Sequence, residues 1–290
     1  MQHNKDSILN TFLVAIGVCL VCSFLVSSAA VGLKELQDKN AEQDRKKNIL
    51  QAAGFTHDEI QEAGGVFDLF ESRVEPVVVK LDSGRPEELE ALVEADPKDK
   101  INQVEDILDQ YDQIKASKNK AMSDEFEDKK VDIAGITRKE KWSHVYLVKD
   151  EDDAVQKYVF PIRGKGLWSI LKGFIAIETD FQTIAGLTYY EHAETPGLGG
   201  EVDNVSWKEK WKGKAIYAEN GDVEIAVIKG IADADDKYAI DGLSGATITS
   251  RGVTNMLQFW LGKDGFGPYI QNQKNGSKVS ALNRAEKNNG

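Results

Sequence analysis

An uncharged run near the start of the chain places the strongest limit on how this sequence can fold. Residues 7–33 contain no Asp, Glu, Lys, Arg or His, and most of their side chains are apolar. A helix of about 20 apolar residues spans the core of a bilayer and satisfies its own backbone hydrogen bonds there. The run therefore predicts a transmembrane helix over residues 8–33, after a short N-terminus at 1–7.

A cleaved signal peptide is the alternative interpretation of this run, because the small residues Ser27–Ala30 would suit a cleavage site. The apolar part of a signal peptide is only about 7–15 residues long, and it follows a positively charged start. Here the run is longer, and Lys5 is offset by Asp6. These features favour an uncleaved anchor with a single span.

Charge leaves the orientation of this anchor open. Five basic residues lie between positions 34 and 47, and the positive-inside rule would then keep the following domain in the cytoplasm. Acidic residues are interleaved with them, however, and long domains cross the membrane largely regardless of charge.

The composition excludes several classes of function. A net charge of −12 argues against a nucleic-acid partner. The only cysteines, Cys19 and Cys22, lie inside the apolar run, where a thiol behaves as a weak hydrophobe. The rest of the chain therefore has no disulfide and no cysteine-ligated iron–sulfur cluster. The four histidines show no metal-ligand spacing, so we expect no metal site.

Between the anchor and position 141 we expect a helical stalk and an acidic accessory region (34–141). Thr56–Glu59 has the spacing of a capping box and predicts a short helix, and residues 76–81 predict a short strand. Residues 82–132 are rich in acidic side chains, with apolar residues at helical spacing from Ile101 to Ile114. We assign no chemistry to this stretch.

From Trp142 the pattern changes to short runs rich in β-branched and aromatic residues, separated by charged or polar turns. Strands are predicted at residues 145–148, 158–162, 174–178, 183–190 and 224–230. Together with the helices, they predict an α+β fold with a largely antiparallel sheet over residues 142–270. The polar residues 271–290 are typical of a flexible tail.

Three glycine-rich loops interrupt this domain, at residues 163–169, 191–200 and 241–250. The last one precedes an apolar helical run at 253–261 and contains four hydroxyl side chains. Free N–H groups and the positive end of a helix dipole make such a loop a phosphate site. The alternative is an ordinary turn in which a Ser or Thr caps the helix.

Other chemistries find little support. The serine in Gly242–Gly245 lacks the G-x-S-x-G pattern of a hydrolase, and neither a P-loop nor a dinucleotide fingerprint is present. His192 beside Glu194 could form an acid/base pair, although a hydrogen-bonded loop residue is the more ordinary role. We therefore expect no catalytic residue on this chain.

The residues Asp241-Gly-Leu-Ser-Gly-Ala-Thr247 resemble the flavinylation motif of FMN-binding domains. Residues 164–168 and 194–199 resemble the other two signature stretches of that domain. With the anchor and the ending Phe259–Pro268, the chain resembles the family of C subunits of bacterial sodium-translocating NADH:quinone oxidoreductases. The acidic stretch 82–132 matches this family less well.

The resemblance implies a covalent FMN in a periplasmic FMN-binding domain, with residues 1–7 in the cytoplasm. Thr247 would carry the flavin through a phosphoester formed by a separate flavin transferase. Lys229 would meet the phosphate or a ring oxygen. The other residues expected around the cofactor are Leu167, Trp168, Thr195, Gly197, Leu198, Ser244, Gly245 and Ala246.

The resemblance further implies a redox subunit that relays electrons while the whole complex oxidises NADH, reduces ubiquinone and exports Na⁺ with its other subunits. Two alternatives remain open. One is the equivalent G subunit of an Rnf-type electron transport complex, which shares the threonine motif. The other is a membrane-anchored assembly module whose flavin is absent or structural.

Overall fold

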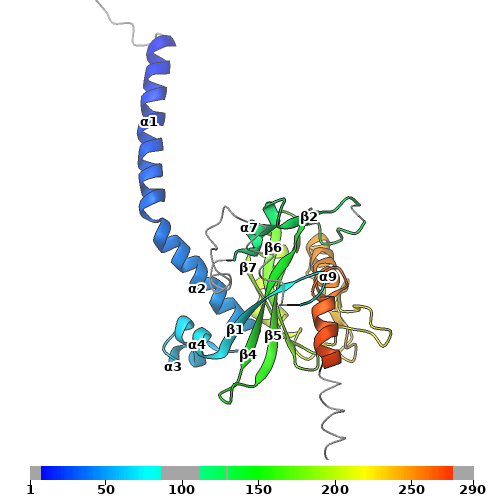
Figure 1. Ribbon diagram of the computed structural model, residues 1–290. Coiled ribbons are helices and arrows are strands. Elements are labelled where there is room, and N and C mark those ends of the chain that lie inside the picture. Colours follow the sequence, from blue (N-terminus) through cyan, green and yellow to red (C-terminus); the bar gives the residue numbers. More distant parts are fainter. Residues whose placement is uncertain (1–7, 86–110, 129, 277–290) are drawn as a thin grey trace, which may run out of the picture. The chain divides into compact units, whose positions relative to one another are not determined.

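The computed structural model describes residues 8–85, 111–128 and 130–276 (Figure 1). It divides into two compact units, Met1–Arg45 and Lys46–Gly290. Most of the amphipathic helix predicted between Ile101 and Ile114 lies outside the described residues.

The first unit is helical. It holds α1 (Ile8–Gly32) and the beginning of α2 (Lys34–Ala52). Every side chain of α1 is exposed, and its mean hydropathy reaches 2.5. Among the described residues, α1 alone is long and apolar enough to cross a membrane.

The second unit is built on an antiparallel sheet whose strand order is β1-β4-β5-β6-β7. Neighbours from β4 onward are also consecutive in the chain, and the connections at residues 150–154, 166–169 and 179–183 join them. The predicted α+β class with a largely antiparallel sheet is confirmed. The strands are β1 (Val74–Lys80), β4 (Trp142–Lys149), β5 (Val155–Lys165), β6 (Ile170–Glu178) and β7 (Ile184–Glu191).

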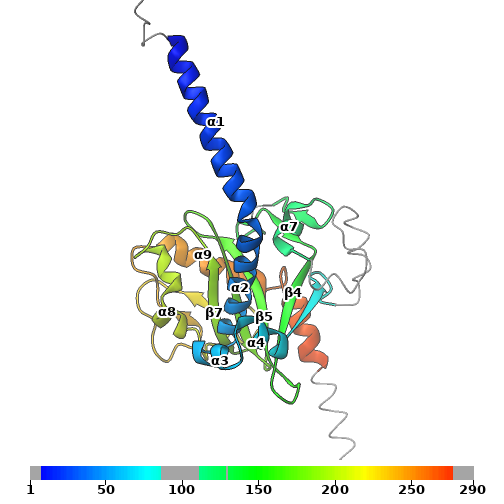
Figure 2. The same cartoon turned by 90° about the vertical axis from the view of Figure 1, so that its left-hand side faces the viewer.

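Both faces of this sheet are buried under apolar clusters. Successive side chains of a strand point to opposite faces, so each strand contributes to both clusters. In β6, Phe174 and Ala176 belong to one apolar cluster, and Ile175 and Ile177 belong to the other. Helix α9 (Thr247–Leu261) packs on the second face, against β5 (Figure 1). The first face is covered by the end of α2 with α3 (His57–Glu62) and α4 (Val66–Arg73), as Figure 2 shows from the side.

The start of α3 has the capping box that the sequence predicts. The Thr56 hydroxyl accepts a hydrogen bond from the Glu59 N–H, and the Glu59 carboxylate accepts one from the Thr56 N–H at 2.7 Å. This capping box satisfies two backbone donors that the first turn would otherwise leave free.

The predicted boundary at 141/142 does not divide the sheet. Strand β1, placed in the stalk and accessory region, pairs along its whole length with β4, from Val74 opposite Val148 to Lys80 opposite Trp142. Helices α3 and α4 likewise belong to the core of the same unit. A short strand reveals its own conformation in the sequence but not its distant partner, so this pairing was missed.

Smaller elements complete the second unit. The strand predicted at 224–230 is reduced to β8, which pairs in parallel with β9. Of the tail predicted at 271–290, the structure describes only residues 271–276, and these are helical together with residues 267–270. The remaining elements are α7 (Gln113–Lys118), β2 (Ser123–Glu125), β3 (Arg138–Glu140), the 3₁₀ helix η2 (Gly199–Asp203), α8 (Val205–Glu209), β8 (Ala226–Val227) and β9 (Ala239–Ile240).

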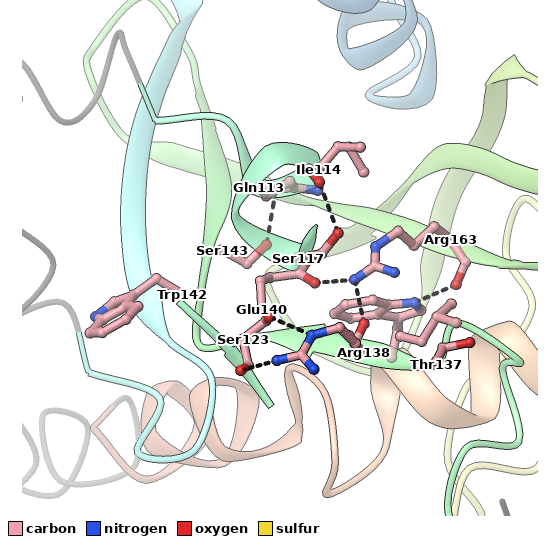
Figure 3. Close-up of polar contacts among 12 residues, drawn as sticks. Gln113, Ile114, Ser117, Ser123, Thr137, Arg138, Glu140, Trp142, Ser143 and Arg163 are labelled. Atoms are coloured by element: carbon pink, nitrogen blue, oxygen red, sulfur yellow. Dashed lines mark hydrogen bonds and ion pairs between the residues drawn. The ribbon is translucent and has the colours of Figure 1, made fainter. Parts of the chain in front are cut away.

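A buried ion pair joins the accessory region to the sheet (Figure 3). The Arg163 guanidinium of β5 pairs with the Glu140 carboxylate of β3, and the two side chains are 7% and 0% exposed. Arg163 also donates to the Arg138 carbonyl at 3.1 Å. Its own carbonyl accepts the Trp260 indole N–H at 2.7 Å, which ties the end of α9 to β5.

Candidate functional site

The flavinylation-like loop leads directly into α9. Its helix begins at Thr247, and the residue in the N-cap position is Ala246, which has no side chain able to cap it. The alternative of a Ser or Thr cap is therefore wrong for this helix. The nearby Ser250 hydroxyl instead accepts a hydrogen bond from the Leu243 N–H at 3.1 Å, behind the loop. The first-turn N–H groups of α9 are thus left without a side-chain cap, beside the exposed Thr247.

Two close approaches fix the shape of this loop. Gly245 has a positive φ of 69°, and a Cβ there would lie 2.9 Å from Cδ2 of Leu198, so the two loops touch. Gly242 donates its N–H to the Gly230 carbonyl at 2.8 Å. Glycine is needed at 245 because other residues rarely adopt this conformation.

Asp241 secures the start of the same loop. Its carboxylate forms an ion pair with Lys210 and accepts the Ala232 N–H at 2.9 Å, and its carbonyl accepts the Trp207 indole N–H. The hydrogen bond from Lys210, followed by the one from Ala232, lowers the pKa of the Asp241 carboxyl. Contacts with Lys210, Ala232 and Trp207 therefore hold the start of the loop in place, ahead of Thr247.

Glu194 connects the other two loops to α9. One carboxylate oxygen accepts the N–H of Trp168 at 3.0 Å and that of Ser169 at 3.4 Å. The other accepts the hydroxyl of Thr249 at 2.5 Å. Glu194 is only 5% exposed, so one buried side chain bridges the 163–169 loop and the first turn of α9.

The hydrogen bonds keep this carboxylate ionised. Burial on its own would raise the pKa of the Glu194 carboxyl above its ordinary value of 4.5. The Thr249 hydroxyl and the N–H groups of residues 167–169 outweigh burial, and the pKa is lowered. In the part of the chain that the structure describes, no lysine or arginine forms an ion pair with Glu194.

Glu194 lies within a signature stretch, but it was not predicted as a site residue. A glutamate in a polar loop is typical of a solvated side chain, and nothing in its spacing announces burial. In the fold, two glycines lie against its carboxylate. A Cβ at Gly166 or Gly199 would lie 2.5 Å or 2.6 Å from its carboxylate oxygens, so both positions must stay small.

Exposed apolar side chains surround the start of α9. Trp168 is 69% exposed, and its indole N–H donates to the Thr195 hydroxyl at 3.2 Å. Leu167 and Leu198 are each 43% exposed, and Ile248 next to Thr247 is 56% exposed. A group of exposed apolar side chains is a common property of ligand sites.

The contacts described above therefore bring most of the predicted site residues together. Leu167, Trp168 and Thr195 meet around Glu194, while Leu198 meets Gly245 in the loop that holds Ser244 and Ala246. Gly197 adopts the positive φ of 75° that turns the chain into this group. Lys229 is exposed and precedes Gly230, the residue bonded to Gly242, so its backbone adjoins the site.

Both ring nitrogens of His192 take part in hydrogen bonds. Its Nε2 lies 2.7 Å from a carboxylate oxygen of Asp203, and its Nδ1 accepts the Glu194 N–H at 3.2 Å. The ring thus links η2 to the loop, which agrees with the hydrogen-bonded alternative. Among the described residues, no group of three or more His, Cys, Asp or Glu side chains could hold a metal ion.

Comparison with known proteins agrees with this geometry. Residues 166–262 match the family described as "FMN-binding domain", and this range contains the loops at 191–200 and 241–250 and residues 166–169 of the first loop. The C subunit of the Na⁺-translocating NADH-quinone reductase of Yersinia pestis is 40% identical over 95% of this chain and 96% of its own length. The corresponding C subunit from Pseudomonas aeruginosa is 43% identical over 94% of this chain and 98% of its own.

The chain belongs to the family of C subunits of the Na⁺-translocating NADH-quinone reductase.

Solved structures show the same fold. The crystal structure of NqrC from Shewanella oneidensis superposes with a TM-score of 0.67 at 31% identity, and the match covers 81% of this chain and 99% of that one. The C subunit of the reductase from Parabacteroides distasonis, at 23% identity and a TM-score of 0.59, agrees in fold. The chain is accordingly part of a NADH:quinone oxidoreductase, with an FMN-binding domain and with other subunits as partners. The Rnf-type alternative is not supported.

Proposed function

We propose that this chain carries FMN bound covalently to Thr247 and relays electrons through it. The observation that carries the proposal is the uncapped start of α9 beside an exposed threonine hydroxyl. A phosphate ester on Thr247 would lie next to free N–H groups and the positive end of the helix dipole, where an anion is stabilised.

The residues present also fit the rest of the cofactor. Gly245 has no side chain that could block the approach of a phosphate, and Ser244 and Ala246 present backbone on either side of it. The exposed indole of Trp168, with Leu167 and Leu198, offers an apolar surface for a planar ring. Thr195 and Gly197 hold the indole and the loop, and Lys229 supplies a cation from the adjoining loop.

Attachment requires a partner enzyme, since a threonine hydroxyl is a weak nucleophile unless it is activated. A flavin transferase would use FAD as the donor. The Thr247 Oγ forms a bond to the phosphorus of the FMN half, the bond to the bridging pyrophosphate oxygen breaks, AMP leaves, and the hydroxyl proton is lost. FMN then supplies the redox chemistry, while this chain orients it and prevents loss of the cofactor.

In the complex, the protein would pass electrons between neighbouring redox centres and so help to couple NADH oxidation and quinone reduction to Na⁺ export. We place the globular unit in the periplasm, with α1 as the anchor. Covalent attachment supports this placement, because a small cofactor lost outside the cytoplasm would not be replaced from a free pool.

Flavin fluorescence on a denaturing gel tests the covalent bond. We expect a fluorescent band for the wild-type chain expressed with a flavin transferase, and no band for Thr247→Ala. Ser244→Ala should keep the band, because that position contributes backbone and not the esterified oxygen. A wild-type chain without a band, or a flavin mass on the Ser244 hydroxyl in peptide mass spectrometry, would overturn the assignment.

Cysteine labelling tests the orientation. In a chain with Cys19 and Cys22 replaced by Ala, a cysteine introduced at the exposed Asp152 should react with a membrane-impermeant maleimide in intact spheroplasts. A cysteine introduced at Asn4 should react only after the membrane is permeabilised. The reverse pattern would place the globular unit in the cytoplasm.

A further inference from the structure

We propose that Glu194 is the positioning residue of the flavin site, and that its negative charge lowers the midpoint potential of the FMN held there. This inference rests on the proposed attachment of FMN at Thr247. It concerns a residue that would shape the site through the groups around it, without being esterified or reacting itself.

The contacts of Glu194 give it a geometric role. Its two carboxylate oxygens reach two elements that are far apart in the sequence, the N–H groups at Trp168 and Ser169 and the hydroxyl of Thr249. Trp168 would flank the flavin ring, and Thr249 lies two residues beyond the proposed attachment point. One side chain therefore sets the separation between the ring's apolar support and the phosphate's anchor.

The packing around Glu194 leaves little freedom for it to move. It is 5% exposed, and Gly166 and Gly199 lie so close to its oxygens that neither could carry a Cβ without a shift. Its own N–H is fixed to the His192 ring at 3.2 Å. A side chain confined in this way transmits its position to the loops it bonds, so a change at 194 should loosen both.

The charge of Glu194 gives it an electrostatic role. Its hydrogen-bond donors are neutral hydroxyl and amide groups, and none of the described lysines or arginines forms an ion pair with it. A buried charge without a counter-ion acts over a longer distance than an exposed one, because water does not screen it. Reducing a flavin adds negative charge to the ring, so a nearby carboxylate disfavours reduction and lowers the potential.

Two variants separate these roles. Glu194→Gln removes the charge and keeps a side chain of the same length. Thr249→Val breaks the hydrogen bond to α9 and keeps the charge. Both are measured in the full-length chain, purified in detergent after expression with a flavin transferase, and circular dichroism checks that each variant is folded.

We expect Thr249→Val to lower the flavin loading several-fold, measured as gel fluorescence per protein, with a midpoint potential close to that of the wild type. We expect Glu194→Gln to shift the midpoint potential of its bound flavin to a more positive value, in an optical redox titration. Glu194→Asp, which restores the charge but not the reach, should return the potential toward the wild-type value while loading stays low.

The outcomes distinguish this inference from the proposed function. A fluorescent wild-type band with unchanged loading in Thr249→Val and an unchanged potential in Glu194→Gln would overturn the role of Glu194 alone. Equal positive shifts in Glu194→Gln and Thr249→Val would show a general loosening, and would overturn the effect of charge. A wild-type chain without a band would instead overturn the attachment at Thr247.

Discussion

Two carboxylates are buried in the described part of the globular unit, and they are held in opposite ways. Glu140 pairs with a guanidinium, in the cluster that joins β3 to β5. Glu194 pairs with no cation there and is held by amide and hydroxyl donors, among the loops of the proposed flavin site. An ion pair cancels its own field, whereas a carboxylate held by neutral donors keeps a net charge. Glu140 therefore neutralises the buried charge of Arg163, whereas Glu194 keeps a charge beside the proposed flavin site.

The largest effect is expected from breaking the ion pair. Glu140→Gln should lower the free energy of unfolding by about 3–5 kcal/mol, because the Arg163 guanidinium then stays buried without a counter-charge. Urea denaturation of the full-length chain in detergent, followed by circular dichroism, would measure it. The double variant Glu140→Leu/Arg163→Met should recover most of the loss, since apolar side chains of similar size need no counter-charge. A double variant as unstable as the single one would contradict this explanation.

A smaller effect is expected from breaking the hydrogen bond between Thr249 and the Glu194 carboxylate. Thr249→Val should cost about 1.5–3 kcal/mol of unfolding free energy, the usual range for a hydrogen bond to a charged group. Thr188→Val is the matched control, because the buried Thr188 hydroxyl donates one hydrogen bond, to the backbone carbonyl of Asn48 at 3.0 Å. It should cost about 0.5–1.5 kcal/mol, in the same urea titration. Equal losses at the two positions would show that the charge of Glu194 adds nothing to its hydrogen bond.

The pH dependence of stability should also distinguish the loop carboxylate. The pKa of Glu194 is lowered in the folded chain, so the unfolded chain binds a proton more readily. Its contribution is fully present above its ordinary pKa of 4.5 and is lost as the pH falls through the lower, folded value. Melting temperatures measured between pH 6 and pH 3, roughly the range in which carboxyls titrate, should therefore fall less steeply for Glu194→Gln than for the wild type. Identical slopes would contradict the lowered pKa.

The smallest effect on stability is expected at the attachment point itself. The side chain of Thr247 is exposed, and none of the described residues forms a hydrogen bond with its hydroxyl. Thr247→Val should change the unfolding free energy of the flavin-free chain by less than about 0.5 kcal/mol, while it abolishes the fluorescent band. A large loss of stability in urea titration would mean that the hydroxyl has a structural role in α9.

Much of the fold followed from local patterns. The capping box at Thr56, the strands predicted at 174–178 and 183–190 and the apolar run of α9 each depend on neighbouring residues alone, and each formed as predicted. The three glycine-rich loops were also identified, because glycine marks turns and close approaches directly in the sequence.

What the sequence did not reveal depends on residues far apart in the chain. The pairing of β1 with β4 joins segments about seventy positions apart. It places β1 in the sheet, although β1 precedes the boundary predicted at 141/142. Ala246 took the N-cap position although hydroxyl residues stood on both sides, and the Ser250 hydroxyl bonds the distant Leu243 N–H. Glu194 and Glu140 look like solvated charges in the sequence, and only the fold shows that both are buried.

Helix α9 is attached near both ends, by Thr249 to Glu194 and by Trp260 to the carbonyl of Arg163. Between these points the helix is a stiff rod, about 1.5 Å long per residue. Because α9 is fixed at two places, it holds these two attachments at a constant distance from each other. Glu140 of the accessory region pairs with Arg163, which provides one of the attachments. A displacement of Arg163 would therefore shift the end of α9 near Trp260, and the helix would carry that shift toward Thr249 and the proposed attachment point at Thr247.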